Sequence, residues 1–178
     1  MRVIGGEFRS RRLQSLAGAA LRPTPDRLRE ALFSVLAPRL AGCTFLDAYA
    51  GSGAVGIEAI SRGAERAVMI EAHRPAARVI EANLQNLGAE DRAQVICGRA
   101  LAHLQRFQAD IVFLDPPYAL GPEYEQSLQA LGARPPSLVV VQHSTRLTLR
   151  EAYGGLKRTR ELKQGDNVLS FFEPAGAP

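Results

Sequence analysis

FLDAYAGSGAVG, residues 45–56, reads as a strand, a tight glycine turn and the start of a helix. The strand is the apolar run that ends at Asp47, and the helix continues through the apolar side chains of Ile57 and Ile60. Gly51 and Gly53 let the backbone approach a ligand because they carry no Cβ, and the first free N–H groups of the helix lie at the same place. This stretch therefore predicts an α/β fold with a ligand at the carboxyl end of its first strand.

The acidic residue that closes the next strand narrows the choice of ligand. Glu71 follows the apolar run 66–70, at about the separation from the glycine turn at which a carboxylate meets a ribose diol in dinucleotide-binding folds. We therefore expect one adenosine-like ligand. The glycines at 51, 53 and 56 also satisfy G-x-G-x-x-G, a pattern that serves NAD and FAD equally well. The glycine pattern alone does not choose between S-adenosylmethionine and these dinucleotides.

Asp47, four residues before the glycine turn, favours a cationic ligand. A carboxylate aimed into the loop repels a pyrophosphate, whereas it attracts the ammonium and sulfonium groups of S-adenosylmethionine. We expect the amino-acid end of this cofactor near Asp47 or Tyr49, and its sulfonium beside Gly51, Ser52 and Gly53. The alternative is a structural role in which Asp47 orients the loop or caps the helix.

A second motif, Asp115-Pro116-Pro117-Tyr118, directly follows the apolar run 109–114. Two successive prolines stiffen the backbone and remove two N–H donors, so the loop offers acceptors. Asp115 and the Pro116 carbonyl can accept both protons of a base's exocyclic amino group, which turns the nitrogen lone pair toward a methyl donor, while Tyr118 stacks on the ring. These four residues form the candidate catalytic set. The alternative is a proline-rich turn that binds nothing.

The rest of the chain alternates strands and helices, as a doubly wound α/β sheet requires. Its 178 residues suffice for one domain with a substantial core. Continuous apolar runs predict strands that are covered on both faces. In the strand order 3-2-1-4-5 the glycine turn and Asp115 face one crevice. We expect helices at 74–87, 100–107 and 123–131, strands at 92–97, 111–114 and 138–141, and a closing hairpin of 156–162 and 168–172.

Positive charge is concentrated ahead of this core. Residues 1–39 carry eight arginines against three acidic residues, a net charge of +5, whereas the whole chain has a net charge of +4. Arginine pairs bidentately with phosphate and stacks on bases, so the cluster predicts contact with nucleic acid. A solvated arginine-rich face is the alternative. We divide the chain into an arginine-rich extension at 1–40 and a catalytic domain at 41–175.

Two elements are expected in this extension. Thr24-Pro25-Asp26 is typical of a helix start, with Thr24 as the cap and Pro25 at the first helical position, and the helix should reach Leu36. Residues 3–8 and 12–14 predict a small hairpin. The candidates for contact with RNA phosphates on this hairpin are Arg9, Arg11 and Arg12.

At this level of detail the chain resembles the RsmD-type bacterial 16S ribosomal RNA guanine-N2 methyltransferases. The resemblance spans nearly the whole chain, from MRVIGG at 1–6, through ISRGA at 60–64, to GDNVLSFF at 165–172. Its most discriminating part is RPTPDRLREALF at 22–33, because the Asp-Pro-Pro-Tyr motif is shared by many amino-methyltransferases, including DNA enzymes.

The resemblance implies a Rossmann-like class I methyltransferase sheet in the order 3-2-1-4-5-7-6, with S-adenosylmethionine as the methyl donor. The implied substrate is a guanine N2 in 16S rRNA, within a small ribosomal subunit or its assembly intermediate. Arg22, Thr24 and Arg27 are implied to border the active site. Related enzymes carry an acid or amide for adenine after the third strand, where this chain has Arg99. Arginine cannot accept that hydrogen bond, so we expect adenine on the backbone N–H of Ala100 or Leu101.

The small number of cysteines and the lack of a long apolar stretch favour a cytoplasmic protein. Cys43 and Cys97 lie at the edges of expected strands without a C-x-x-C motif, so we expect two buried, reduced thiols in a cytoplasmic protein. No apolar stretch approaches the roughly 18 residues of a membrane span. The three histidines lack partners at metal-ligand spacing, so we expect no metal.

Three classes of function remain open at this point. The favoured one is an rRNA guanine-N2 methyltransferase. The second is a DNA or other RNA amino-methyltransferase that acts on N6 of adenine or N4 of cytosine with the same tetrapeptide. The third is a nucleotide-binding oxidoreductase that contains only the glycine pattern.

Overall fold

The computed structural model describes residues 1–16, 25–117 and 120–176. Its helices are α1 (Asp26–Leu40), α2 (Ala54–Ser61), α3 (Arg74–Leu87), α4 (Ala100–His103) and α5 (Gly121–Gly132), with short 3-10 turns at η1 (Glu90–Arg92) and η2 (Leu104–Arg106). Its strands are β1 (Thr44–Asp47), β2 (Arg66–Glu71), β3 (Ala93–Cys97), β4 (Ile111–Leu114), β5 (Leu138–Ser144), β6 (Ala152–Tyr153), β7 (Leu156–Gln164) and β8 (Asn167–Pro174).

All eight strands form one sheet in the order β3-β2-β1-β4-β5-β8-β7-β6. The first five are parallel, as their continuous apolar runs predict, and β8 and β7 add antiparallel strands. The expected order 3-2-1-4-5-7-6 is confirmed, because β8 occupies the place of the seventh strand and β7 that of the sixth. The two-residue strand β6 at the outer edge was not expected.

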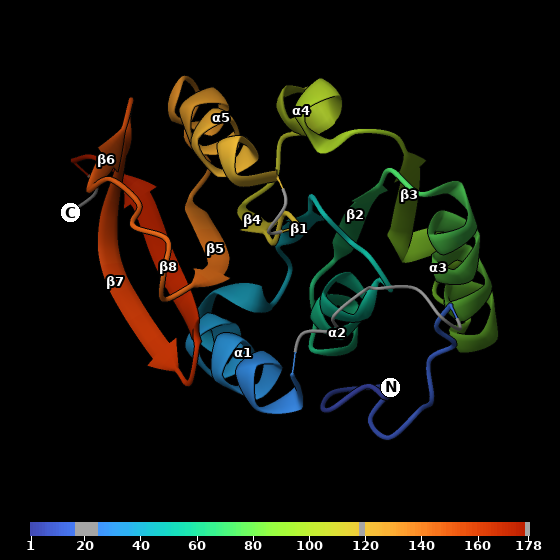
Figure 1. The fold of residues 1–178 in the computed structure, drawn as a ribbon. Helices are drawn as coiled ribbons and strands as arrows, with labels where there is room; N and C mark the ends of the chain where they lie inside the picture. Colours follow the sequence, from blue (N-terminus) through green and yellow to red (C-terminus); the bar gives the residue numbers. More distant parts are fainter. Residues whose placement is uncertain (17–24, 118–119, 177–178) are drawn as a thin grey trace.

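Helices cover both faces of the sheet (Figure 1). Alternate side chains of each strand enter one of two apolar cores. Phe45, Phe113 and Val140 pack in the core beneath α1, α2 and α3, whereas Leu46, Leu114 and Val141 pack in the core beneath α4 and α5. This alternation determines which polar side chains share a face where the strands end.

The N-terminal segment and α1 belong to the first of these cores. Val3, Phe8 and Leu13 are buried in it together with Leu32 and Leu36 of α1. Residues 1–14 fold back on themselves through one antiparallel bridge between Arg2 and Arg12, so the expected hairpin is present without regular strands. The extension therefore packs on the catalytic part as a continuation of its core.

Several element boundaries differ from the expected ones. The helix that should end at Leu36 continues to Leu40 and contains Pro38, and Pro25 occupies the cap rather than the first helical position. The expected cap Thr24 lies outside the described residues. The helix expected at 100–107 is one turn of α-helix followed by a 3-10 turn, which leaves a short connection between β3 and β4.

The two thiols have different surroundings. Cys43 is buried as expected, and burial together with the nearby Asp110 raises its pKa to about 11. The expectation of a buried Cys97 was wrong: it ends the edge strand β3 and is exposed. In the described part of the chain, no helix has both the length and the apolar character of a membrane span.

Candidate active site

A cavity of about 870 Å³ lies at the carboxyl ends of β1, β4 and β5. Its volume is typical of sites that hold cofactors and small molecules. The strand order reverses between β1 and β4, and open α/β sheets bind ligands at such a point. Three expected residues that the structure describes, Gly53, Leu101 and Arg27, do not line this cavity. The expected residues that do are Asp47, Tyr49, Gly51, Ser52, Glu71, Ala100, Asp115, Pro116 and Pro117.

The glycine turn has the strand-turn-helix form expected from the sequence. Gly53 caps α2 with a φ of 77°, which favours glycine. A Cβ on Gly53 would lie 2.9 Å from Ile80 Cγ2, so this glycine also lets α3 pack against the turn. A Cβ on Gly51 would meet nothing within 4 Å, which leaves open space above the turn for a ligand.

Asp47 is buried at the floor of the cavity. Its Oδ2 accepts a hydrogen bond from the N–H of Gly56 at 3.0 Å, and this contact holds the start of α2 over β1. Its Oδ1 is also buried, and no described residue donates a hydrogen bond to it. One oxygen therefore orients the loop, while the other can serve a ligand.

Three carboxylates give this part of the cavity its electrostatic character. Burial, together with the charges of Asp115 and Glu71, raises the pKa of Asp47 to about 7, against the hydrogen bonds from the backbone N–H groups of Gly56 and Tyr49. A bound cation would favour the ionised form of Asp47 and relieve repulsion among the three groups. The cavity is therefore suited to a cationic ligand and unsuited to a pyrophosphate.

Glu71 holds the two turns that flank the ligand site. Its Oε2 accepts the N–H of Gly51 at 2.8 Å, and its Oε1 accepts the N–H of His73 at 2.7 Å. Each carboxylate oxygen can accept a second hydrogen bond, so these contacts are compatible with ribose hydroxyls. Contact between Glu71 and a ribose remains a prediction.

The loop after β3 forms the cavity wall next to Glu71. Gly98, Arg99 and Ala100 line the cavity here, so Ala100 is the better placed of the two backbone candidates for adenine. The guanidinium of Arg99 lies 3.4 Å from Oε1 of Glu123, which comes from α5 and also lines the cavity. The positive charge of Arg99 is thus paired with the carboxylate of Glu123 from α5.

The Asp-Pro-Pro loop continues directly from β4. Asp115 is half-buried at the cavity wall, and Pro116 is buried behind it. The hydroxyl of Tyr124 donates a hydrogen bond to the Pro116 carbonyl at 3.1 Å. A carbonyl oxygen has two lone pairs, so this one can still accept a proton from a substrate. Tyr118, expected to stack on the base, lies outside the described residues.

Tyr49 is tied to α5. Its hydroxyl lies 2.9 Å from Oγ of Ser127, and burial raises its pKa above the ordinary value. The phenol therefore stays neutral at physiological pH. Tyr49 contributes a neutral ring to the cavity wall, and Asp47 is the charged member of the pair expected near the amino-acid end of the cofactor.

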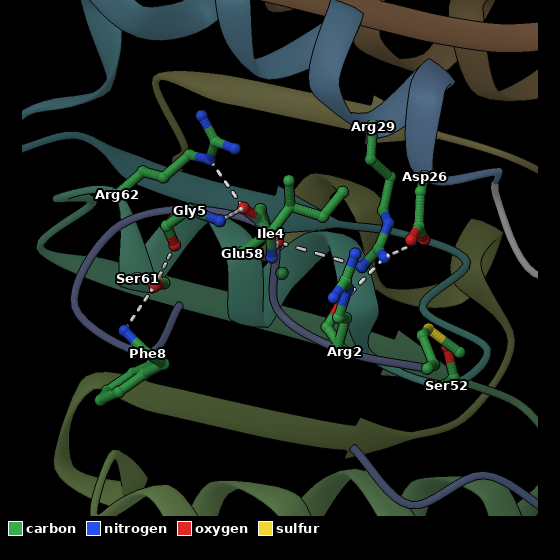
Figure 2. Close-up of polar contacts among 12 residues, drawn as sticks. Arg2, Ile4, Gly5, Phe8, Asp26, Arg29, Ser52, Glu58, Ser61 and Arg62 are labelled. Atoms are coloured by element: carbon green, nitrogen blue, oxygen red, sulfur yellow. Dashed lines mark hydrogen bonds and ion pairs between the residues drawn. The ribbon is translucent and has the colours of Figure 1, made fainter. Parts of the chain in front are cut away.

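The N-terminal segment is fastened to α2 by buried polar groups. Figure 2 shows the carboxylate of Glu58 between the backbone of the segment and the side chains of Arg29 and Arg62. Glu58 accepts the N–H groups of Ile4 and Gly5, both at 2.8 Å. These contacts hold the segment along the helix that carries the glycine turn.

Arg29 belongs to the same cluster, and its position shows that the prediction of contact with nucleic acid was wrong for this arginine. It was counted with the arginines that indicate nucleic acid, yet its side chain is completely buried. Its Nη2 donates hydrogen bonds to the Arg2 carbonyl at 3.0 Å and to Oδ1 of Asp26 at 2.7 Å (Figure 2). Its Nη1 lies 4.0 Å from Oε2 of Glu58. Arg29 therefore links the N-terminal segment, α1 and α2.

This fold-back brings to the cavity several residues that sequence reasoning did not assign. Met1, Ser15 and Leu16 reach it from the two ends of the segment, and Pro25 and Asp26 reach it from the start of α1. The sequence contained only an indirect signal, the resemblance around 1–6 and 22–33. Two further lining residues come from β5 and β8, namely Gln142 and Asn167.

The candidate RNA-binding arginines that the structure describes are exposed. Arg9 and Arg12 lie on the surface of the segment, and Arg11 donates to the Asn86 carbonyl of α3 at 2.8 Å. The N–H of Glu7 binds the Ser61 carbonyl, so this tip of the segment lies at the end of α2 remote from the glycine turn. Arg27 is exposed in the first turn of α1. Arg22 and Thr24 lie outside the described residues.

Residues 1–16, 25–117 and 120–176 contain no cluster of three or more histidine, cysteine, aspartate or glutamate side chains that could hold a metal ion.

The mixed sheet, the glycine turn after β1 and the Asp-Pro-Pro loop after β4 define a class I methyltransferase fold. Within this class, the chain belongs to the family described as conserved hypothetical protein 95, whose profile matches residues 1–173. The resemblance to RsmD-type enzymes is confirmed at the level of the family.

Individual relatives support this assignment. Ribosomal RNA small subunit methyltransferase D of Escherichia coli is 42% identical over 123 residues, which span 68% of this chain and 62% of that protein. YlbH of Bacillus subtilis, provisionally named an rRNA methyltransferase, is 33% identical over 189 residues, 99% of this chain and 100% of that protein. The solved structure of yhhF from Escherichia coli has a TM-score of 0.86 at 30% identity and covers 99% of each chain.

Proposed function

We propose that the protein transfers a methyl group from S-adenosylmethionine to the N2 amino group of a guanine in 16S ribosomal RNA. The observation that carries the proposal is the meeting, in one cavity, of the buried carboxylate of Asp47 with Asp115 and Pro116. The first suits a cationic cofactor, and the other two suit an exocyclic amine. Ribosomal RNA methyltransferases among the relatives support the class of substrate.

The polar groups that line the cavity fit the proposed cofactor. When bound, S-adenosylmethionine supplies an electrophilic methyl group. Asp47 offers a buried oxygen that no described residue satisfies, which suits an ammonium group, and Glu71 offers acceptors for ribose hydroxyls. The backbone at Gly98 and Ala100 provides the neighbouring wall for an adenine.

The chain's contribution to transfer is alignment of the amine. Asp115 and the Pro116 carbonyl accept the two amino protons, and the hydroxyl of Tyr124 holds the Pro116 carbonyl in place. With both protons engaged, the nitrogen lone pair is directed out of the plane of those contacts. An exocyclic amine needs no covalent intermediate on the protein, so positioning and electrostatics are sufficient.

The surface that runs from the cavity along α2 to the tip of the N-terminal segment suits a folded RNA. Exposed arginines on the N-terminal segment and at the start of α1 provide charges for phosphates without base specificity. Residues 1–40 would thus act as an RNA-facing extension of a catalytic part at 41–175. The proposed partner is 16S rRNA within a small ribosomal subunit or an assembly intermediate, which would place the protein in the cytoplasm.

Other activities fit less well. An oxidoreductase would need to hold the pyrophosphate of NAD or FAD against Asp47, Glu71 and Asp115, where like charges repel. A DNA or other RNA amino-methyltransferase could use the same Asp-Pro-Pro loop, although the relatives named for an activity act on ribosomal RNA.

The proposal is tested by binding and by transfer. Titration calorimetry with S-adenosylmethionine and with NAD should give heat only with the former. Transfer of tritiated methyl groups should label small ribosomal subunits taken from a strain that lacks the gene, and should not label duplex DNA. Binding of NAD, or methylation of DNA in place of rRNA, would contradict the proposal.

A further inference from the structure

Gln142 occupies the cavity wall beside the Asp-Pro-Pro loop. The register between β4 and β5 pairs Phe113 with Val140 and Leu114 with Val141, so Asp115 and Gln142 follow at the next step of each strand. Phe113 and Val140 both point into the core beneath α1. Because side chains alternate along a strand, Asp115 and Gln142 leave the sheet side by side on this same face.

The amide of Gln142 has an unsatisfied acceptor. The residue is only 5% exposed, and its Oε1 is buried with no hydrogen bond from any described residue. A buried acceptor without a donor costs about 1–3 kcal/mol, and such groups in native proteins call for an explanation. Gln142 lines the cavity, so a turn of its side chain can bring this acceptor to a donor on a ligand.

The chemistry of the bases identifies that donor. In guanine the carbon that bears the 2-amino group lies between two ring nitrogens, of which N1 carries a hydrogen and N3 does not. In adenine and cytosine the ring nitrogen next to the amino group is a bare acceptor. A protein that holds the amino group at Asp115 can therefore distinguish guanine from the other two bases. It needs an acceptor that faces N1, next to the amino group on the Watson–Crick edge.

We propose that Gln142 is a specificity-determining residue that accepts the N1–H of the target guanine while Asp115 and Pro116 hold its amino group. The inference rests on the proposed function, since it assigns the base edge that the same site reads. A glutamine amide can turn to offer either its oxygen or its nitrogen. A glutamate at this place would offer only acceptors once ionised, which makes the two possibilities separable.

The chain provides a matched control. Gln164 also has a buried Oε1 without a hydrogen-bond partner in the described residues, but it lies on β7 and does not line the cavity. A loss of activity that arises merely from removing a buried amide should appear equally in Gln164→Leu and Gln142→Leu. A loss that arises from reading the base should appear only in Gln142→Leu.

The experiment measures methyl transfer by the wild type, Gln142→Leu, Gln142→Glu and Gln164→Leu. The substrates are small subunits reconstituted with 16S rRNA that carries, at the methylated nucleotide, either guanosine or 2-aminopurine riboside. The second base keeps the 2-amino group and lacks the N1–H. Titration calorimetry with S-adenosylmethionine and thermal melting report whether each variant folds and binds cofactor.

On guanosine, Gln142→Leu should lower kcat/KM tenfold to hundredfold with unchanged cofactor affinity, whereas Gln164→Leu should stay within a few-fold of the wild type. Gln142→Glu keeps an acceptor oxygen, so it should retain more activity than Gln142→Leu. The wild type should prefer guanosine over 2-aminopurine by a similar factor, and Gln142→Leu should lose this preference.

Full activity of Gln142→Leu on guanosine, or an equal response of the wild type to both bases, would overturn the inference. Retained activity in Gln142→Leu together with a dead Gln142→Glu would do so as well, since it would mean that no acceptor is needed. A wild type that transfers no methyl group to guanine N2 would instead remove the proposed function, and the inference with it.

Discussion

Replacement of Asp47 by asparagine should stabilise the free protein and weaken cofactor binding. The pKa of Asp47 rises from 3.8 to about 7 on folding, chiefly because the carboxyl is buried. A pKa raised on folding adds stability that is complete below the unfolded pKa and is lost as pH rises through the folded pKa. Above pH 7 the folded chain thus holds a buried charge at a cost of roughly 4 kcal/mol.

Asparagine keeps an oxygen that can accept the Gly56 N–H, and it removes the charge. Asp47→Asn should therefore exceed the wild type in free energy of unfolding by a few kcal/mol at pH 8, and this advantage should shrink steadily toward pH 5. For S-adenosylmethionine, the loss of a charge-assisted contact should raise the dissociation constant about tenfold to hundredfold at pH 8.

Cofactor affinity should also depend on pH in the wild type. A bound cation favours the ionised carboxylate, so S-adenosylmethionine should bind about tenfold more tightly at pH 8 than at pH 6, and Asp47→Asn should abolish this difference. Urea unfolding of the free proteins from pH 5 to pH 8 and calorimetric titrations at the same pH values measure both effects. A stability difference that does not change with pH, or equal cofactor affinity in the two proteins, would refute the reasoning.

Three further sets of substitutions test the cofactor site, the N-terminal arginines and the Asp-Pro-Pro loop separately. Glu71→Ala should raise the dissociation constant for S-adenosylmethionine about tenfold to hundredfold in calorimetry, and unchanged affinity would remove Glu71 from the cofactor site. Simultaneous replacement of Arg9, Arg11 and Arg12 by alanine should weaken RNA binding and leave cofactor affinity intact. The slope of the logarithm of the binding constant against the logarithm of salt concentration should fall by roughly 2 to 3 in filter binding. An unchanged slope would mean that the segment is solvated and does not contact RNA phosphates. Asp115→Ala should abolish methyl transfer in the tritium assay without loss of cofactor binding, and full activity of this variant would exclude Asp115 from catalysis. Asp115→Asn keeps one acceptor oxygen and removes the charge. Partial activity of Asp115→Asn would mean that geometry outweighs charge.

Local sequence was sufficient for the frame of the fold. Apolar runs that end at Asp47, Glu71 and Leu114 predict parallel strands because burial on both faces leaves little room for polar side chains. The glycine turn is also a local signal, since a positive φ at Gly53 and its contact with Ile80 require glycine. These features fixed where the strands end and therefore which motifs meet.

Features that depend on register or on long-range packing were not predictable in the same way. Gln142 became a candidate only when the register of β5 beside β4 was known, because nothing in its local sequence distinguishes it. Arg29 appeared to be a surface charge until the fold placed Glu58 and Asp26 around it. Cys97 was expected to be buried, but an edge strand exposes what a central strand would cover.

The proposed reaction is methylation of N2 of a guanine in small-subunit rRNA. The most direct measurement is mass spectrometry of nucleosides and mapped fragments of 16S rRNA from a strain that lacks the gene, before and after treatment of its small subunits with the protein and S-adenosylmethionine. One N2-methylguanosine should be absent at first and should be restored by the wild type, whereas Asp115→Ala should not restore it. Restoration of a methylated adenine or cytosine, or no methylation of 16S rRNA at all, would contradict it.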